Sequence, residues 1–344
     1  MKTKSRSVAL LFLMTLCGCR MSPAKEEIHL YIWTNYIQPA ILEEFEKQEG
    51  IRVVVDYYAS NEELLAKLEG GAAGYDVIVP SDYMVSIMVR RDILARMDRS
   101  KLPNFKNLDP RFLGLYYDPS DGYSVPYAWG VTGIAYDAEA VQPPPQGWGI
   151  FWDERYKGRM SLLNDQREVF AMALQHLGYP VSSQDPAQIG RARDALKTQK
   201  KLVRTYSSES YERYFLTGDV VLAHAWSPDI HQIVKEKPSV RFVIPKEGGI
   251  IWTDNLCIPA GSKKQEQAHR LINYLLQPEV TVRIVRNRMI GCLNRAAYSL
   301  LPEELRKDPT IVPQNVVLKR LAWMQDVGPA LPLYDRAWTE LKVE

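Results

Sequence analysis

The chain has 344 residues, of which 43 are Lys or Arg and 41 are Asp or Glu, so its formal net charge is only +2. A chain so close to neutral lacks the strongly basic face that nucleic-acid binding requires, and we expect no nucleic-acid partner. Its length is about twice that of a usual domain of roughly 150 residues, which predicts two lobes.

The N-terminus has the layout of a bacterial export signal. Lys2, Lys4 and Arg6 precede an apolar run over residues 8–16, which is too short to span a bilayer as a stable helix. We therefore expect residues 1–18 to be removed as a lipoprotein signal peptide. The mature chain would then carry 40 basic and 41 acidic residues.

Cys19 is the expected site of lipidation. The run ends in a segment that resembles a bacterial lipobox, because the small Gly18 precedes Cys19, whereas the bulky Leu16 precedes Cys17. We expect the acylated Cys19 to hold a periplasmic protein at its membrane through a tail over residues 19–26. An ordinary cleaved signal is the alternative.

Two cysteines remain in the expected fold, Cys257 and Cys292. Export would permit a disulfide between them, but two buried thiols fit the sequence equally well. No stretch after Cys19 is long and apolar enough to cross a membrane.

The first part of the mature chain alternates strands and helices. The pattern predicts strands over residues 29–33, 51–58 and 76–79 and helices over residues 37–48 and 60–68. Glu63 follows Ser60 by three residues, which is typical of a capped helix start. Such a βαβαβ unit forms a parallel sheet whose ligands bind beyond the carboxyl ends of the strands. The segments 33–36 and 81–83 lie at two such ends.

A second α/β block follows a long extended segment over residues 124–136. We expect strands over residues 160–163, 220–225 and 240–244 and helices over residues 168–177 and 186–200. Residues 250–259 are extended again, and a further helix starts at residue 268. The pattern therefore predicts two α/β lobes joined by two extended crossings.

Signatures of enzymes are missing from the sequence. It has no GxSxG elbow, P-loop, HExxH or dinucleotide fingerprint, and its five histidines lack metal-ligand spacing. We therefore expect no catalytic residue, no metal and no cofactor. What stands out instead is a set of acids and large aromatic residues near the expected strand ends: Trp33, Tyr36, Tyr83, Asp165, Glu168, Trp226, Trp252 and Asp254.

Several blocks of sequence resemble one family in the same order. They are WTNY from Trp33, YDVIVPS from Tyr75, SVPYAWG from Ser124, DQREVF from Asp165, PKEGGIIWTDNL from Pro245 and DVG from Asp326. With these blocks, the mature chain resembles the periplasmic spermidine/putrescine-binding proteins of bacterial ABC transporters. The resemblance implies a non-enzymatic receptor that delivers a polyamine to a transporter permease.

The resemblance also implies a type II periplasmic-binding fold with the ligand between the lobes. We assign residues 27–130 and 256–300 to the first lobe and residues 131–255 and 301–344 to the second. We expect a monomer whose lobes close about residues 127–133 and 252–258 when the ligand binds.

Ten positions match ligand-contacting positions of this family. Thr34, Tyr36, Ser81 and Tyr83 correspond to contacts of the first lobe, with Trp33 beside them. Asp165 and Glu168 match an acid pair that receives one amine end, and Asp254 matches the acid of another ammonium. Trp226 and Trp252 match aromatic walls along the methylene chain. Carboxylates separated by aromatic faces suit a ligand in which ammonium groups alternate with methylenes.

Four further positions could tune the ligand. Ile290 and Met324 replace hydrogen-bonding residues of the family, Gln325 adjoins Met324, and Asp82 adds an acid beside the first-lobe positions. The length of the polyamine stays open for this reason. A different cationic or amino-acid ligand is the first alternative, and an enzyme or structural surface lipoprotein is the second.

Overall fold

The computed structural model describes residues 26–34, 36–71, 74–208 and 210–343. The predicted signal peptide, Cys19 and most of the tail lie outside the described residues. Within them, no helix is long and apolar enough to cross a membrane. The strands are β1 (Glu26–Trp33), β2 (Ile51–Tyr58), β3 (Val77–Ile78), β4 (Ser124–Asp137), β5 (Met160–Leu162), β6 (Val203–Tyr206), β7 (Leu222–Trp226), β8 (Val240–Val243), β9 (Gly249–Cys257), β10 (Gly291–Cys292) and β11 (Leu321–Trp323).

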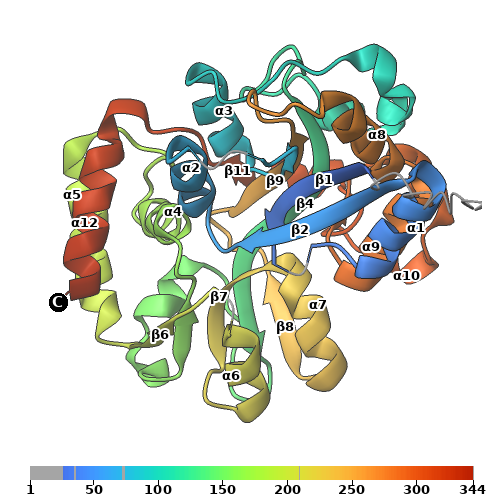
Figure 1. Ribbon diagram of the computed structural model, residues 1–344. Helices are drawn as coiled ribbons and strands as arrows, with labels where there is room; N and C mark the ends of the chain where they lie inside the picture. The colour runs from blue at the N-terminus through green and yellow to red at the C-terminus, as the bar shows by residue number, and fades with distance from the viewer. Residues whose placement is uncertain (1–25, 35, 72–73, 209, 344) are drawn as a thin grey trace, which may run out of the picture.

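The helices surround these strands (Figure 1). They are α1 (Pro39–Glu49), α2 (Asn61–Glu69), α3 (Asp82–Arg90), α4 (Gln166–His176), α5 (Pro186–Lys200), α6 (Tyr211–Thr217), α7 (Ser227–Glu236), α8 (Gln265–Leu275), α9 (Pro278–Arg288), α10 (Glu303–Lys307), α11 (Asn315–Leu318) and α12 (Leu331–Val343).

The N-terminal βαβαβ unit forms as the sequence predicted. Strand β1 pairs in parallel with β2 along its whole length and with β3 on its other side. Ser60 caps α2, since its Oγ accepts a hydrogen bond from the backbone N–H of Glu63 at 3.1 Å. The carboxylate of Glu63 in turn accepts the N–H of Ala59 at 3.0 Å. This reciprocal cap fixes where the chain enters the helix.

Two long buried strands, β4 and β9, connect the two halves of the molecule. They run antiparallel from the pair Ser124↔Cys257 to the pair Thr132↔Ile250. At one end β9 pairs with β3, and at the other β4 continues beside β7 and β8. Figure 1 shows β4 running from the part with β1 and α3 down to the part with β7 and β8. These strands are the two predicted crossings.

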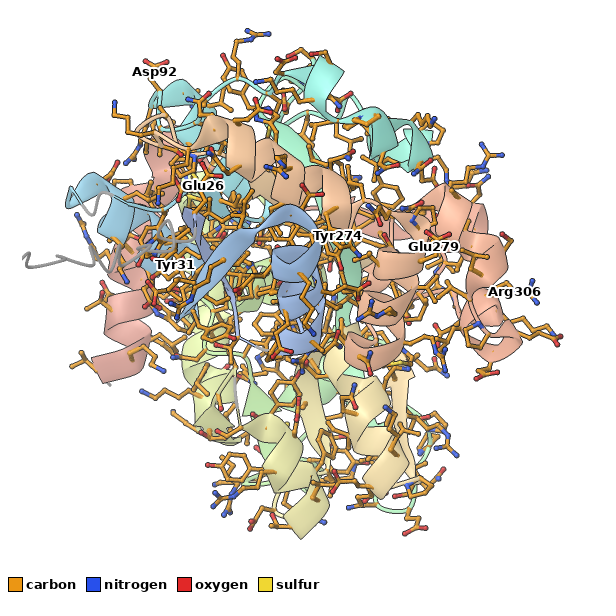
Figure 2. The ribbon with its side chains drawn as sticks, turned by 45° about the vertical axis from the view of Figure 1, so that its right-hand side comes forward. Glu26, Tyr31, Asp92, Tyr274, Glu279 and Arg306 are labelled. Carbon is orange, nitrogen blue, oxygen red and sulfur yellow. The ribbon has the colours of Figure 1, made fainter. Side chains whose placement is uncertain are left out.

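Each half has its own apolar core. The largest core of the first lobe includes Phe45 of α1, Trp129 of β4 and Tyr274 of α8. Tyr274 ties α8 to α1, because its ring lies 5.3 Å from that of Phe45 and its hydroxyl donates to the carbonyl of Ile41 (Figure 2). The core of the second lobe is built around Phe170 of α4 and Tyr334 of α12.

The C-terminal part differs from the predicted lobe boundaries. The sequence pattern assigns all residues after 300 to the second lobe, whereas Leu301 and Ile311 pack with Val285 of α9 in the first lobe. The chain then passes through β11, which pairs in parallel with β9, and ends in α12, which packs on α4 and α5. The lobes are therefore joined by a third, short crossing around residues 321–328.

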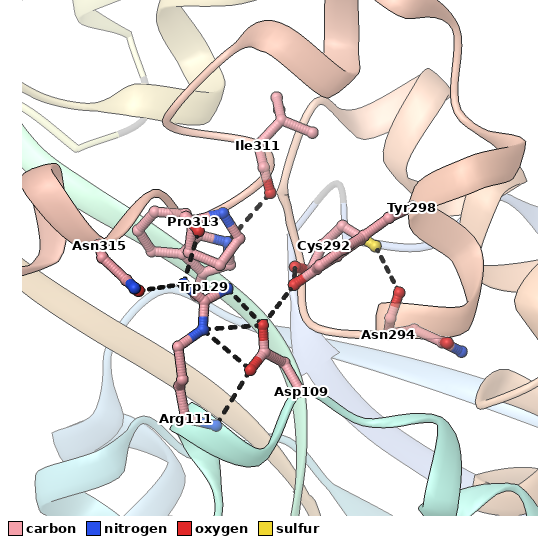
Figure 3. A network of polar contacts seen from close by, with 9 residues as sticks. All are labelled: Asp109, Arg111, Trp129, Cys292, Asn294, Tyr298, Ile311, Pro313 and Asn315. Carbon is pink, nitrogen blue, oxygen red and sulfur yellow. Dashed lines mark hydrogen bonds and ion pairs between the residues drawn. The ribbon is translucent and has the colours of Figure 1, made fainter.

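A polar network holds the segment before α11, which leads to this third crossing, against the first lobe (Figure 3). The guanidinium of Arg111 forms an ion pair with Asp109 and donates to the carbonyl of Pro313 at 2.8 Å. On the hinge strand β4, the indole N–H of Trp129 donates to the carbonyl of Ile311 at 3.1 Å. These contacts fix the chain before α11 to both Asp109 and the hinge.

The two cysteines left open by the sequence are buried free thiols. Cys257 pairs with Ser124 of β4, and Cys292 pairs with Ala128 on the other side of the same strand. This register separates their Cα atoms by roughly 16 Å. A disulfide requires less than about 7 Å, so no disulfide joins them in this fold.

Candidate binding site

A cavity of about 550 Å³ lies between the two lobes. The first lobe contributes Trp33, Tyr36, Asn61, Ser81, Asp82 and Tyr83 to its lining. The second lobe contributes Asp165, Glu168, Trp226, Pro228 and Asp229. The crossings contribute Trp252, Asp254 and Met324. Because most of these residues follow the ends of β1, β3, β5 and β7, the site lies where parallel strands expose their carboxyl ends.

Three tryptophans give the cavity its apolar walls. The indole N–H of Trp33 donates to the carbonyl of Val79 at 2.9 Å, which holds the ring between β1 and β3. Trp252 crosses the hinge strand β4 directly above Gly130, where a Cβ atom would lie 2.2 Å from its ring. The glycine at position 130 therefore makes room for this wall.

Five carboxyl groups line the cavity, and none of the described residues that line it is basic. Asp254 is the best held of the five. One of its oxygens accepts the hydroxyl of Ser81 and the other that of Tyr36, both at 2.6 Å. Burial raises the pKa of Asp254 to about 6, although these two hydrogen bonds lower it.

Glu168 and Asp165 lie together at the start of α4. Asp165 caps the helix, since its carboxylate accepts the backbone N–H of Glu168 at 3.0 Å. One oxygen of Glu168 accepts Thr132 Oγ1 at 2.9 Å and Trp226 Nε1 at 3.2 Å, whereas its buried Oε2 has no hydrogen-bond partner. Burial, and then the neighbouring Asp165, raise the pKa of Glu168 to about 8. An unpaired buried oxygen of this kind is suited to receive a cationic donor.

Asp82 and Asp229 complete the set of acids. Asp82 is fully buried at the start of α3, and burial raises its pKa well above the ordinary value. Asp229 lies in the first turn of α7 and accepts a hydrogen bond from the hydroxyl of Tyr211. Burial raises the pKa of Asp229 to about 6.

The cavity brings together eleven of the fourteen ligand positions selected from the sequence. Thr34 is exposed and does not line it. Ile290 is buried in the first-lobe core beside Tyr127, on the wall of a different, smaller cavity. Gln325 is exposed, and its backbone binds Ser182 and Arg167.

Sequence reasoning missed three residues of the lining, Asn61, Pro228 and Asp229. Asn61 begins α2 and binds both the N–H and the hydroxyl of Ser81, so it orients a residue that holds Asp254. Pro228 and Asp229 begin α7, directly after Trp226. The sequence could have indicated Asp229, because Asp229 is an acid three residues after Trp226, a tryptophan at a strand end.

The site can bind a cation by charge and hold an apolar chain between its rings. Each acid would gain a charge-assisted hydrogen bond of about 1.5 to 3 kcal/mol from an ammonium group. A neutral ligand would leave buried carboxylates without partners as the cleft closes, which is unfavourable. None of the described residues forms a cluster of three or more His, Cys, Asp or Glu side chains that could hold a metal ion.

Comparisons with known proteins agree with this arrangement. The family of bacterial extracellular solute-binding proteins matches residues 40–312. Over 317 residues, 92% of this chain, the sequence is 38% identical to the spermidine/putrescine-binding periplasmic protein of Escherichia coli (strain K12), of which it covers 91%.

Solved structures are also similar. The spermidine/putrescine ABC transporter substrate-binding protein of Streptococcus pneumoniae superposes with a TM-score of 0.80 at 30% identity, over 92% of this chain and 99% of that one. A lipoprotein of Treponema pallidum gives a TM-score of 0.86 at 32% identity, over 93% and 100%. These similarities confirm the predicted solute-binding fold, which is consistent with type II, and the matched proteins are transporter solute-binding proteins rather than enzymes. The chain therefore belongs to the family of bacterial extracellular solute-binding proteins.

Proposed function

We propose that the protein captures a polyamine, spermidine or putrescine, in the cleft between its lobes and delivers it to the permease of an ABC transporter. The observation that carries the proposal is the cavity itself, in which five carboxyl groups and three tryptophans meet without a basic side chain among the described lining. The name of the Escherichia coli relative supports the ligand class.

In this proposal the ligand lies along the cleft. Asp165 and Glu168 receive one terminal ammonium, Asp254 receives a second, and Trp226 and Trp252 pack against the methylenes between them. Trp33, Tyr36, Ser81 and Tyr83 of the first-lobe lining surround the other end. Three charge-assisted hydrogen bonds and cation–π contacts of up to about 2 kcal/mol suffice for the roughly 8 kcal/mol of micromolar binding after ordering costs.

Binding would favour closure of the lobes. The cavity takes contacts from both lobes, so a ligand gains more from the closed form than from the open one. The permease would then recognise the closed form. The third crossing modifies the boundaries that we propose for the lobes, because residues 301–312 belong with the first lobe and residues 329–343 with the second.

We further propose that the protein is a monomer held at its membrane by acylated Cys19. The relative from Treponema pallidum is named a lipoprotein, which supports the anchor. A short tail between Cys19 and β1 would raise the concentration of the receptor near its permease.

Native mass spectrometry of the exported protein tests the ligand class. Putrescine, spermidine, spermine, lysine and arginine are each added at equal concentration, with glucose as the neutral control. We expect one polyamine per chain and no glucose. Retention of the amino acids in preference to every polyamine would contradict the proposal.

A further inference from the structure

Asp82 lines the cavity but points its carboxylate at the backbone. The residue is fully buried as the first residue of α3. One oxygen accepts the N–H of Tyr83 at 2.7 Å, and the other accepts the N–H of Thr253 at 3.3 Å. No Lys, Arg or His among the described residues pairs with it. Both of its oxygens are thus used by backbone amides from two different elements.

The amide of Thr253 lies where the sheet beside β9 stops. Strand β3 pairs with β9 at Ile78↔Cys257, one further bridge joins Ser81 to Asp254, and the chain then enters α3 at Asp82. The carbonyl of Pro80 still accepts the N–H of Asn255 at 2.9 Å. Two residues along, the next amide on that side of β9 is that of Thr253, and there the carboxylate of Asp82 takes the place of a strand. Without it a buried backbone donor would have no partner.

Thr253 lies between two residues of the proposed site, Trp252 and Asp254. Strand β4 holds this part of β9 from one side, through the register Gly130↔Trp252 and Ala128↔Asp254. Asp82 holds it from the other side. The position of Trp252 and Asp254 in the cavity therefore depends on both supports.

Asp82 also lies near the third crossing. The hydroxyl of Tyr116, which is close enough to Asp82 to affect the pKa of its carboxyl group, donates to the carbonyl of Met324 at 2.8 Å. The carboxyl group of Asp82 thus joins the start of α3 in the first lobe to the hinge strand β9, beside the segment that holds Met324.

We propose that Asp82 is a positioning residue, which clamps the hinge strand β9 at Thr253 so that Trp252 and Asp254 face the ligand. The proposal rests on the proposed polyamine binding but assigns Asp82 a different part from that of the acids that meet ammonium groups. Substitution of a positioning residue should lower the affinity for every ligand of the site equally. Substitution of an ammonium partner should lower the affinity more for ligands that carry more charge.

The substitutions Asp82→Asn and Asp82→Ala separate these roles. The asparagine keeps the volume but must turn an NH₂ group toward one of the two amides, so one hydrogen bond is lost. The alanine removes both bonds together with a buried acid. If the asparagine variant does not fold, the alanine variant carries the test.

Asp76→Asn is the matched control. Asp76 is a buried acid of the same lobe that accepts a backbone N–H, that of His29, at 3.0 Å. It does not line the cavity. Its substitution reports the general cost of weakening a buried carboxylate-to-amide hydrogen bond in this lobe.

Calorimetry with putrescine and spermidine, and amide exchange of Thr253 measured by NMR, give the readouts on the full exported chain. We expect both Asp82 variants to lose roughly tenfold in affinity for both ligands alike. Exchange at Thr253 should become faster, while that of Val131 on β4 stays as in the wild type. The control should keep its affinity.

Two results would overturn the assignment. One is an unchanged Kd together with unchanged exchange at Thr253. The other is a loss of affinity that is much larger for spermidine than for putrescine, because this would make Asp82 an ammonium partner. If the wild type binds neither polyamine, the proposed function fails, whereas exchange at Thr253 still decides whether Asp82 clamps β9.

Discussion

Asp254 is a buried carboxyl group whose partners are neutral. Ser81 and Tyr36 donate to its two oxygens, and no cation among the described residues contacts it. If an ammonium group completes this site, Asp254→Asn should weaken polyamine binding by about 2 to 5 kcal/mol, because the ligand loses its charged partner. Calorimetry measures the change. Asp56→Asn, at an exposed acid of β2 outside the cavity, should leave the affinity unchanged, and equal affinities of the two variants would remove Asp254 from the site.

Glu168 predicts a pH dependence with a definite sign. Its pKa is raised from the ordinary 4.5 to about 8 by burial and by Asp165, so the empty cleft keeps its proton at neutral pH. The ligand-free fold should therefore lose stability as the pH rises from about 4.5 to about 8, where Glu168 would ionise in the fold.

Binding of an ammonium group should instead favour the ionised form of Glu168. At pH 7 the ligand should release about one proton from Glu168, and the affinity should rise with pH up to about 8. Calorimetry in buffers of different ionisation heat measures the release. The proton release should vanish in Glu168→Gln and persist in Glu212→Gln. The carboxyl group of Glu212 also has a raised pKa, about 7, but Glu212 does not line the cavity. Identical heats in all buffers would refute the assignment.

At the scale of residues, the sequence could select cavity residues that lie at or shortly after strand ends. Trp33 is the last residue of β1, Ser81 follows β3 and Asp165 follows β5, so the order of the strands is enough to bring them to one edge of the sheet. Asp229 and Asn61 could not be selected in this way, since polar residues at helix starts usually serve as caps. The match of Ile290 to a ligand position came from the resemblance to the family, whereas the left-handed turn at Met289 directs the chain into the first-lobe core.

Among the elements, the hinge strand β4 offers the sharpest test. A Cβ on Gly130 would lie 2.2 Å from the ring of Trp252, so Gly130→Ala must displace this wall of the cavity. We expect a loss of stability of about 1 to 3 kcal/mol from overpacking and an affinity at least about tenfold lower. Denaturation and calorimetry measure the two effects. Gly190→Ala is the control, because nothing lies near a Cβ at that position of α5; it should be neutral or slightly stabilising. Unchanged ligand affinity in Gly130→Ala would exclude Trp252 as a ligand wall.

Most strands and several helices were predicted from the sequence pattern, whereas helix α3 and strand β11 were not. The amphipathic helix α5 has the predicted bounds, Pro186–Lys200. Helix α3 was missed because it is apolar on most of its surface, as expected of a helix covered by both β9 and the surrounding loops. Strand β11 has only three residues and is defined by its pairing with β9. No local sequence pattern therefore predicts the third crossing.

At the scale of the whole molecule, the proposed anchor at Cys19 can be tested by changing the cysteine. We predict that Cys19→Ala moves the protein from the membrane fraction to the soluble periplasmic fraction, because the acylated residue is lost. Cys17→Ala should leave it at the membrane, since Cys17 lies in the part of the signal that is removed. Fractionation followed by immunoblotting measures this. A membrane-bound Cys19→Ala protein would contradict the anchor.

The two-lobed architecture was predictable from the alternation of strands and helices. Two βαβ-rich blocks each have to bury the faces of their sheets, and only a few arrangements do so. The lobe to which the residues after 300 belong was not predictable, because residues 301–312 and 331–343 pack on different cores through contacts distant in sequence. The cleft is lined by residues of both lobes and of two of the three crossings, β9 and the third.

The most direct test of the central claim is a calorimetric titration of the exported protein with spermidine. We predict one site per chain with micromolar or tighter affinity, and loss of that heat in a variant that combines Asp254→Asn with Glu168→Gln. An absence of binding heat at every temperature tried, or undiminished affinity in the double variant, would contradict the account.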